Sequence, residues 1–320
     1  MKRKVVLDVD TGTDDAIAVM MAGLAREIDL IGCTTVWGNH GTDETTENTL
    51  RVLDLLGRDD VPVRRGLDRP FAPIPFIFED HVDSAREAIH PHEFPIPRTS
   101  ERQAEPGAVE WLVETLRAAT EPITLVPVAP LTNIAAAITL DPSIVDAVDE
   151  IVIMGGAHAL GNVTPSAEAN IWHDPVAADV VFRAGFERLV LVPLDATHRA
   201  NVSLGQIARL RELGPVGAAA AELIAQRIRG YNETQPMDEV DTAPIHDALC
   251  IAYLLDPEVI DIAPYHVAVD TVSPLTFGKT VVDVAGRSGH KPNAYVALDA
   301  DAQRFGSLLH GVIAASGPAR

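Results

Sequence analysis

The chain has 320 residues, of which 46 are acidic and 25 basic, so its formal net charge is −21; 47% of its residues are hydrophobic. So acidic a chain lacks the basic surface that nucleic acids and anionic lipids require, and neither a nucleic acid nor a membrane is expected as a partner. The hydrophobic fraction excludes intrinsic disorder, and the length allows one large domain or two smaller ones.

The sequence also indicates where the protein works. No apolar stretch reaches the roughly 18 residues that a membrane-spanning helix needs, and the first residues show no signal-peptide pattern. Cys33 and Cys250 both lie in apolar segments, which favours two buried thiols over a disulfide. We therefore expect a cytoplasmic protein.

Short apolar runs alternate with helical patterns along the chain, which is typical of a parallel sheet covered by helices on both faces. In chain order, the first part predicts a strand at 4–9, a helix at 14–27, a strand at 30–36, helices at 45–56 and 107–119, a strand at 123–128, a helix at 131–140 and a strand at 150–154. The second part predicts a helix at 175–184, a strand at 189–193, helices around 204–213, 216–230 and 247–255, strands near 265–270, 279–284 and 294–298, and a final helix from about 301. The predicted fold is an α/β, Rossmann-like, open and mostly parallel sheet.

Three irregular stretches interrupt this alternation, at about 70–106, 157–172 and 231–245, and we interpret them as lid loops. No repeat, low-complexity tract or linker divides the chain, so residues 1–320 are expected to form a single domain. Ligands of such folds bind beyond the carboxyl ends of the strands. The loops of interest therefore follow Val9, Val36, Val128, Met154 and Pro193.

The loop after the first strand is rich in acids, with Asp8, Asp10, Asp14 and Asp15 within eight residues. A helix N-terminus explains one or two of them, because its free N–H groups and dipole favour an acid there. The others would repel one another in a low dielectric unless a cation or a proton intervenes. Oxygen ligands alone favour Ca²⁺ or Mg²⁺ over Zn²⁺.

Known motifs narrow the interpretation of this loop. An EF-hand counted from Asp8 would require a glutamate where Val19 stands, and a dinucleotide fingerprint would require three spaced glycines where only Gly12 is present. The segment Asp8-Val9-Asp10-Thr11 resembles the nucleophile loop of haloacid-dehalogenase-type phosphatases, which use Mg²⁺. That alternative also needs a downstream lysine, for which Lys279 is available.

Four later segments carry further polar residues, and each also has a structural interpretation. Asn39 suits a turn, and Asp247 suits a helix N-cap. His246, just before that cap, suits a polar surface. Glu168 and Asn170 are two residues apart, which places both on one face of an extended segment.

Together these segments resemble the inosine–uridine-type nucleoside hydrolase family over nearly the whole chain. The matching pieces, in order, are Asp8 to Asp15, Gly38-Asn39, Pro130-Leu131-Thr132-Asn133-Ile134-Ala135, Met154-Gly155-Gly156, Glu168-x-Asn170 before Asp174-Pro175, and His246-Asp247. The resemblance implies a Ca²⁺-dependent hydrolase that cleaves the N-glycosidic bond of ribonucleosides and gives ribose and free base.

The resemblance also implies roles for single residues. Ca²⁺ would be held by Asp10, Asp15, Asp247 and the backbone carbonyl of Val128, and a metal-bound water would be activated by Asp10. His246 would assist departure of the base, with a pKa suited to that role near pH 7.

The sugar and base would be held by other residues. Asp14 would accept from a ribose hydroxyl, and the residues expected to bind the hydroxyls and the 5′ end are Asn39, Asn162, Glu168 and Asn170. The chain departs from the family near residue 80, where His81 is the candidate to replace a family histidine. Trp172 has two interpretations, stacking on a base or packing in the core.

The resemblance further implies a homodimer or homotetramer. Two alternatives stay open at this point: a haloacid-dehalogenase-like Mg²⁺ phosphatase that uses Asp8 and Asp10, or a non-catalytic protein that binds ribosyl compounds.

Overall fold

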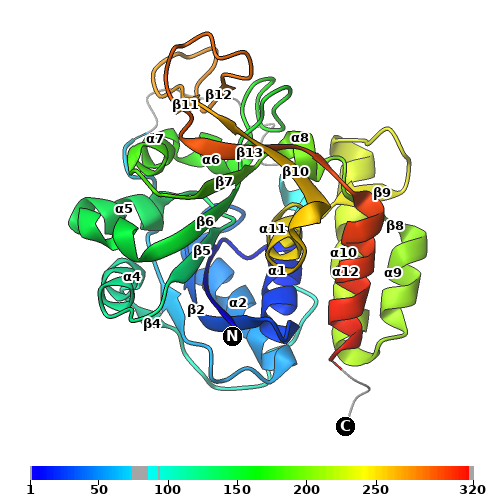
Figure 1. The fold of residues 1–320 in the computed structure, drawn as a ribbon. Coiled ribbons are helices and arrows are strands. Elements are labelled where there is room, and N and C mark those ends of the chain that lie inside the picture. Colours follow the sequence, from blue (N-terminus) through cyan, green and yellow to red (C-terminus); the bar gives the residue numbers. More distant parts are fainter. Residues whose placement is uncertain (1, 74–85, 93, 317–320) are drawn as a thin grey trace.

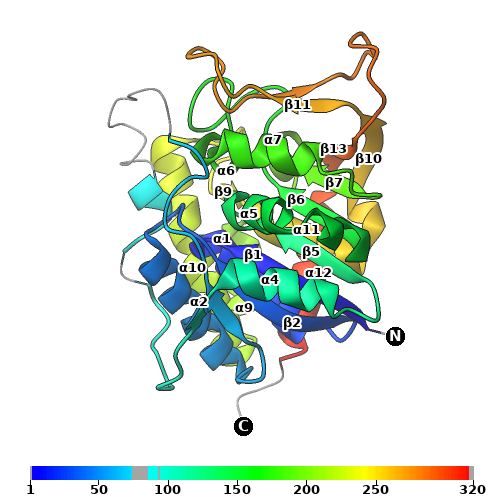
Figure 2. The ribbon, with the colours of Figure 1, turned by 90° about the vertical axis from the view of Figure 1, so that its left-hand side faces the viewer.

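The computed structural model describes residues 2–73, 86–92 and 94–316. Within these residues the centre is a nine-stranded sheet, in which the pair β10–β13 is antiparallel and the other pairs are parallel (Figures 1 and 2). The strands, in their order across the sheet, are β10 (Ile260–Tyr265), β13 (Ala294–Ala300), β7 (Leu189–Val192), β6 (Val148–Met154), β5 (Ile123–Pro127), β1 (Arg3–Val9), β2 (Ile28–Thr35), β3 (Val63–Arg65) and β4 (Glu105–Pro106). The predicted α/β class with a mostly parallel sheet is confirmed.

Helices cover both faces of this sheet. The described helices are α1 (Thr13–Leu24), α2 (Thr42–Leu56), α4 (Ala108–Arg117), α5 (Thr132–Leu140), α6 (Ala169–His173), α7 (Pro175–Arg183), α8 (Leu194–Thr197), α9 (Leu204–Arg211), α10 (Gly214–Thr234), α11 (His246–Leu255) and α12 (Ala302–Ala314), with 3₁₀ turns η1 (Pro142–Ala147) and η2 (Pro257–Val259). Helices α4, α5 and α7 lie on one side of the sheet, and α1, α11 and α12 lie on the other (Figure 1).

The strand residues divide between two hydrophobic cores because side chains alternate across a sheet. In β1, Val5, Leu7 and Val9 belong to the core under α1 and α11, whereas Val6 belongs to the core under α4, α5 and α7. Both faces of this strand therefore pack against an apolar core, and Val5, Val6 and Leu7 form a continuous hydrophobic run.

The strand order places a topological switch point beside β1. From β1 the chain continues through β2 and β3 on one side, and it later returns with β5 on the other side. Loops that leave neighbouring strands in opposite directions open a crevice at the carboxyl edge of the sheet. The acidic loop after β1 and the loop after β5 meet at this crevice.

The structure corrects several predicted boundaries. The first helix ends at Leu24. The stretch 157–172 contains the start of α6. In the stretch 231–245, α10 continues to Thr234, and β9 (Thr242–Pro244) pairs with β8 (Asn201–Ser203).

The C-terminal strands differ more from the prediction. The edge strand β10 was missed because Pro264 argues against a strand, but an edge position tolerates proline since one side of the strand needs no partner. Strands β11 (Val267–Val269) and β12 (Thr280–Val282) pair with each other outside the main sheet.

Two further expectations can be compared with the structure. Cys33 and Cys250 are buried free thiols, as predicted. Within residues 2–73, 86–92 and 94–316, no helix has the length and apolar character of a membrane span.

Candidate active site

A cavity of about 260 Å³ lies at the carboxyl edge of the sheet. Its walls include eight of the residues predicted from sequence: Asp14, Asn39, Val128, Asn162, Glu168, Asn170, His246 and Asp247. Asp10 and Asp15 are at most 1% exposed and are hydrogen-bonded to the wall residue Asn39. The fold thus brings the separate sequence segments to one place.

The loop after β1 is held in shape by its own carboxylates. Asp15, in the first turn of α1, accepts hydrogen bonds from the backbone N–H of Asp10 at 3.1 Å and of Gly12 at 3.0 Å. Asp10 Oδ2 accepts from the backbone N–H of Asn39 at 2.6 Å. Residue 38 must be glycine for this contact, because a Cβ there would lie 2.0 Å from Asp10 Oδ2.

Three buried carboxylates come close together at the cavity. Ligand oxygens of Asp14, Asp15 and Asp247 all lie within 4.8 Å of one another. Burial, reinforced by the neighbouring carboxylates, raises the pKa of Asp15 to about 6 and the pKa of Asp247 well above its ordinary value. A divalent cation would offset both the cost of burying the charged carboxylates and the repulsion between them, so these acids fit a metal ion.

Asp10 is a further candidate metal ligand, although it does not belong to the group of Asp14, Asp15 and Asp247 whose oxygens lie within 4.8 Å of one another. Its Oδ1 atom is buried and has no hydrogen-bond partner among the described residues. Burial and the Asp15 charge raise its pKa well above the ordinary value. Since every candidate ligand is an oxygen, a hard cation such as Ca²⁺ or Mg²⁺ fits better than Zn²⁺.

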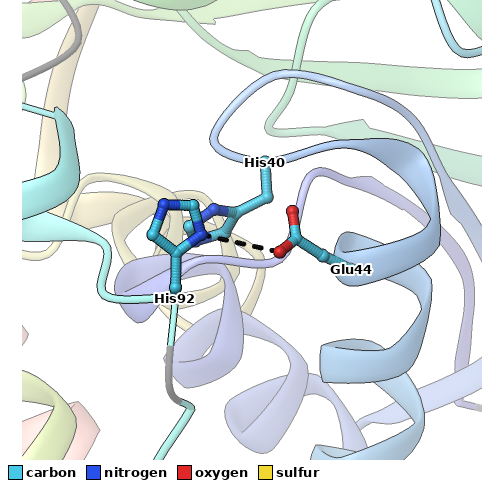
Figure 3. A group of neighbouring side chains, drawn as sticks. All are labelled: His40, Glu44 and His92. Carbon is cyan, nitrogen blue, oxygen red and sulfur yellow. Dashed lines mark ion pairs between the residues drawn. The ribbon is translucent and has the colours of Figure 1, made fainter.

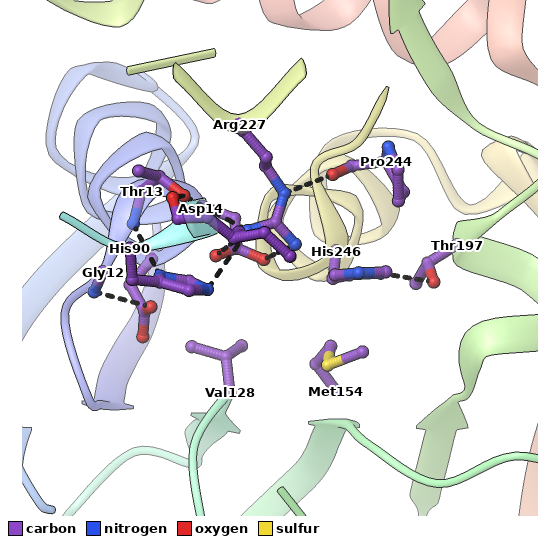
Figure 4. A network of polar contacts seen from close by, with 12 residues as sticks. Gly12, Thr13, Asp14, His90, Val128, Met154, Thr197, Arg227, Pro244 and His246 are labelled. Atoms are coloured by element: carbon purple, nitrogen blue, oxygen red, sulfur yellow. Dashed lines mark hydrogen bonds and ion pairs between the residues drawn. The ribbon is translucent and has the colours of Figure 1, made fainter. Parts of the chain in front are cut away.

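Arg227, on α10, is a member of the site that the sequence analysis missed. It is 2% exposed, and its Nη1 and Nη2 atoms each lie 2.8 Å from one carboxylate oxygen of Asp14. Its Nε donates to the carbonyl of Pro244 at 2.6 Å, as Figure 4 shows. Both oxygens of Asp14 are therefore already paired, which makes Asp10 the better candidate for a metal ligand.

Tyr231 was missed together with Arg227. The two residues are four positions apart on α10 and so share a helix face, which lines the cavity. The sequence pattern ended this helix at about 230, and an arginine between Gln226 and Arg229 resembles an ordinary solvated surface. Only the buried contact with Asp14 identifies it.

His246 begins α11 and is hydrogen-bonded through both ring nitrogens. Nδ1 lies 2.6 Å from Thr197 Oγ1, and Nε2 lies 2.6 Å from the hydroxyl of Tyr231. Burial, with a further contribution from Arg227, lowers its pKa well below the ordinary 6.5. This corrects the expectation of a pKa near 7: the ring is a neutral imidazole that relays hydrogen bonds.

Glu168 and Asn170 connect the stretch 157–172 to the residues that follow β5 and β6. The Glu168 carboxylate accepts from the backbone N–H of Gly156 at 2.7 Å and of Asn170 at 2.9 Å, and burial raises its pKa to about 7. Asn170 Nδ2 donates to the carbonyl of Val128 at 3.0 Å, the group proposed from sequence as a metal ligand. Asn162 accepts from the backbone N–H of Ala169 at 3.0 Å. These side chains position the cavity wall as well as lining it.

Other predicted residues lie elsewhere. Trp172 is 8% exposed and packs with Ala167 and Phe277 in a small apolar cluster, and it is not among the residues that line the cavity. This placement agrees with the core interpretation of Trp172 and not with stacking on a base. His81 lies outside the described residues.

Two residues of the phosphatase alternative, Asp8 and Lys279, make hydrogen bonds that hold the fold. Asp8 is buried, and its Oδ1 accepts from Thr34 Oγ1 at 2.6 Å and from Asn133 Nδ2 at 2.8 Å. Lys279 Nζ donates to the carbonyls of Ala157 at 2.9 Å and His158 at 2.7 Å. Neither residue lines the cavity.

The fold and site define an α/β protein with an acid-lined cavity for a small polar molecule. Residues 5–307 match the family model described as inosine-uridine preferring nucleoside hydrolase, and the chain belongs to this family. It is therefore a ribonucleoside hydrolase, an enzyme that hydrolyses an N-glycosidic bond. The family assignment leaves the phosphatase and the non-catalytic alternatives without support.

Individual relatives agree with this assignment. The chain is 39% identical to the pyrimidine-specific ribonucleoside hydrolase RihA of Escherichia coli O9:H4 (strain HS), over 97% of each chain. It is 38% identical to RihA of Salmonella gallinarum, also over 97% of each chain. Among solved structures, the purine-preferring ribonucleoside hydrolase from Gardnerella vaginalis superimposes with a TM-score of 0.88, at 31% identity, and covers 98% of this chain and 99% of that chain.

Proposed function

We propose that this enzyme hydrolyses ribonucleosides with the help of Ca²⁺ held by Asp10, Asp15, Asp247 and the carbonyl of Val128. The observation that carries the proposal is the set of buried carboxylates at the cavity, with Asp10 Oδ1 lacking any partner among the described residues. Buried carboxylates that lack counter-charges are costly, and an all-oxygen set suits a hard divalent cation.

The proposed chemistry places a base and a charge-stabilising surface beside the sugar. The cation, when bound, would lower the pKa of a water molecule. Asp10 would take the proton of the attacking water at Oδ1, while its Oδ2 stays fixed by the N–H of Asn39. The surrounding carboxylates would favour the positive charge that develops on the ribose ring as the glycosidic bond breaks.

His246 would assist the departing base as a neutral hydrogen-bonding group. Because both its nitrogens are engaged, it would act through the hydroxyl of Tyr231, which also lines the cavity. The Tyr231 hydroxyl, oriented by His246 and Thr197, would donate a hydrogen bond to the departing base. The base would take its proton from solvent, and Asp10 would return the proton of the attacking water to solvent.

The remaining cavity residues would hold the sugar. Asp14, fixed by Arg227, would accept from a ribose hydroxyl, and the residues proposed to bind the other hydroxyls and the 5′ end are Asn39, Asn162, Glu168 and Asn170. We further propose a homodimer or homotetramer, supported by the family assignment, that works in the cytoplasm, where buried free cysteines stay reduced.

The test is a panel of purine and pyrimidine ribonucleosides incubated with the purified protein and Ca²⁺. Both base classes are needed, since the relatives are named for different bases. We expect free base and an equal amount of reducing sugar from at least one member. No release from any nucleoside would contradict the proposal, and release that persists unchanged after chelation would contradict the role of Ca²⁺.

A further inference from the structure

A second group of metal-ligating side chains lies apart from the acid cluster that Asp10, Asp14, Asp15 and Asp247 form at the cavity. Ligand atoms of His40, Glu44 and His92 all lie within 4.8 Å of one another. His40 lies two residues before the start of α2, Glu44 lies in its first turn, and His92 comes from the stretch 86–92 (Figure 3). From this juxtaposition we propose that the three residues form a binding site for Zn²⁺ or a similar transition-metal ion.

The buried member of the group favours a ligand. His40 is 8% exposed, and its Nε2 atom is buried without a hydrogen-bond partner among the described residues. A buried polar atom of this kind normally has a partner, and leaving it without one costs free energy. The His40 ring lies beside the His92 ring, with centroids 5.2 Å apart (Figure 3). A bound metal ion would satisfy the unpartnered nitrogen.

The distances suit a tetrahedral ion. His92 Nδ1 and Glu44 Oε1 are 3.5 Å apart. Two ligand atoms that are each about 2.0–2.1 Å from Zn²⁺ at tetrahedral positions lie about 3.4 Å apart. The ligand atom of His40 lies within 4.8 Å of both, so His40 would move closer when the ion binds all three residues.

A carboxylate lies near the other nitrogen of His92, slightly beyond hydrogen-bonding distance. His92 Nε2 lies 3.7 Å from Glu87 Oε1. Histidines that bind a metal through one nitrogen commonly donate the other N–H to a carboxylate, which fixes the ring and raises its basicity. Glu87 would orient His92 in this way.

The donor set separates this site from the acid cluster. Two imidazoles and one carboxylate suit Zn²⁺ and related ions, whereas Ca²⁺ prefers oxygen. An ion can reach the site from solvent, because the side chains of His92 and Glu44 are 63% and 53% exposed. Both residues also line a surface cavity of about 770 Å³.

The site would connect two parts of the active-site wall. His40 follows Asn39, which is hydrogen-bonded to Asp10 and Asp15, and His92 lies two residues after His90, which lines the cavity. A metal ion that joins His40 to His92 would therefore hold the segment 86–92 against the start of α2. The inference does not depend on the proposed use of Ca²⁺.

The experiment is calorimetric titration of the Ca²⁺-saturated protein with Zn²⁺, repeated with Co²⁺ so that visible absorption reports coordination. We expect one Zn²⁺ per chain that His92→Ala and Glu44→Gln each weaken by about 100-fold, and that Glu87→Gln weakens by about tenfold. Glu47→Gln, the same chemical change on the same helix, should leave the affinity unchanged. His92 and Glu44 are half-exposed, so these variants are expected to fold.

Two results would overturn the site. One is identical Zn²⁺ affinity and stoichiometry in the wild type and His92→Ala, which would assign the ion to the acid cluster. The other is no Zn²⁺ binding by the wild type, which would leave His92 as a simple ion-pair partner of Glu44 and Glu87. Zn²⁺ should slow the amide hydrogen exchange of residues 86–92 in the wild type but not in His92→Ala. Equal exchange in the wild type with and without the ion would show that Zn²⁺ does not hold the segment 86–92 against the start of α2.

Discussion

Two groups of buried ionisable residues meet at the active-site cavity, and burial affects them in opposite ways. The acid cluster consists of Asp10, Asp14, Asp15 and Asp247, and the histidine pair consists of His90 and His246. Burial raises the pKa of the acids and lowers the pKa of both histidines, because the charged form is the costly one in each case.

The two groups therefore need different partners. The histidines are satisfied as neutral rings: His90 Nδ1 accepts from the backbone N–H of Thr13 at 3.2 Å, and His246 has Thr197 and Tyr231. The acids need positive charge, and within the described residues Arg227 forms an ion pair with Asp14 but with none of the other three acids. The comparison predicts that substitutions in the acid cluster, loss of Arg227 or removal of Ca²⁺ affect activity and stability more than substitutions around the histidine pair.

The largest effect is expected for Asp10→Asn. This change removes the proposed base and a proposed metal ligand together, so kcat/KM should fall by at least about 10³-fold. Steady-state hydrolysis of the best nucleoside of the panel measures it. Asp59→Asn, on an exposed turn, is the matched control and should keep the wild-type rate. A loss of less than about tenfold for Asp10→Asn would move the base to another residue.

Arg227→Met tests the counter-charge of the acid cluster. The substitution keeps the length of the side chain but leaves the buried Asp14 without its ion pair, which should lower the free energy of unfolding by about 3–5 kcal/mol. Urea denaturation in saturating Ca²⁺ measures this change. Arg229→Met, on the same helix but 55% exposed, should change it by less than about 0.5 kcal/mol. Equal stability of the two variants would show that Asp14 needs no counter-charge.

Removal of the metal tests the remaining acids. Ca²⁺ at about 100 times its dissociation constant should stabilise the fold by about 2.7 kcal/mol, because it binds the folded state and not the unfolded chain. Thermal unfolding with Ca²⁺ and with a chelator measures the difference. Asp247→Asn should be insensitive to Ca²⁺ over the same range. A wild-type Tm that does not respond to Ca²⁺ would contradict the proposed metal site.

Thr197→Val tests the histidine side. Valine has nearly the shape of threonine, but it leaves His246 Nδ1 buried without its partner, which should cost about 1–3 kcal/mol of unfolding free energy. Chemical denaturation measures it, with Thr139→Val on the exposed end of α5 as the control. If Thr197→Val lowered the free energy of unfolding as much as Arg227→Met, the acid cluster would not depend on its partners more strongly than the histidine pair does.

Residues near the start of a helix or the end of a strand could be predicted to lie in the site. Asp10, Asp14 and Asp15 stand where a buried strand gives way to a helix, and the local pattern marks that position without any tertiary contact. Asp247, at the start of α11, suited a helix N-cap by its local pattern, and the family resemblance identified it as a candidate metal ligand. The position of the acid-rich loop followed from the rule that ligands bind at the carboxyl edge of such sheets.

Residues in the middle of a long helix could not be found. Arg227 and Tyr231 lie within α10, which the pattern ended too early, and an arginine in a polar run has no feature that distinguishes a buried site residue from a surface one. Trp172 was ambiguous for the same reason, since an aromatic residue suits a base pocket and a core equally well. Its packing against Phe277 identifies the core.

The sequence by itself determined the α/β fold, the acid-rich loop and the family, because hydrophobic periodicity and ordered motifs are local properties of the chain. The tertiary structure decided the state of the ionisable groups. It paired Asp14 with Arg227, 213 positions away along the chain, and it enclosed His246 as a neutral ring. Burial and long-range charge contacts set these states, and both depend on how distant segments pack together.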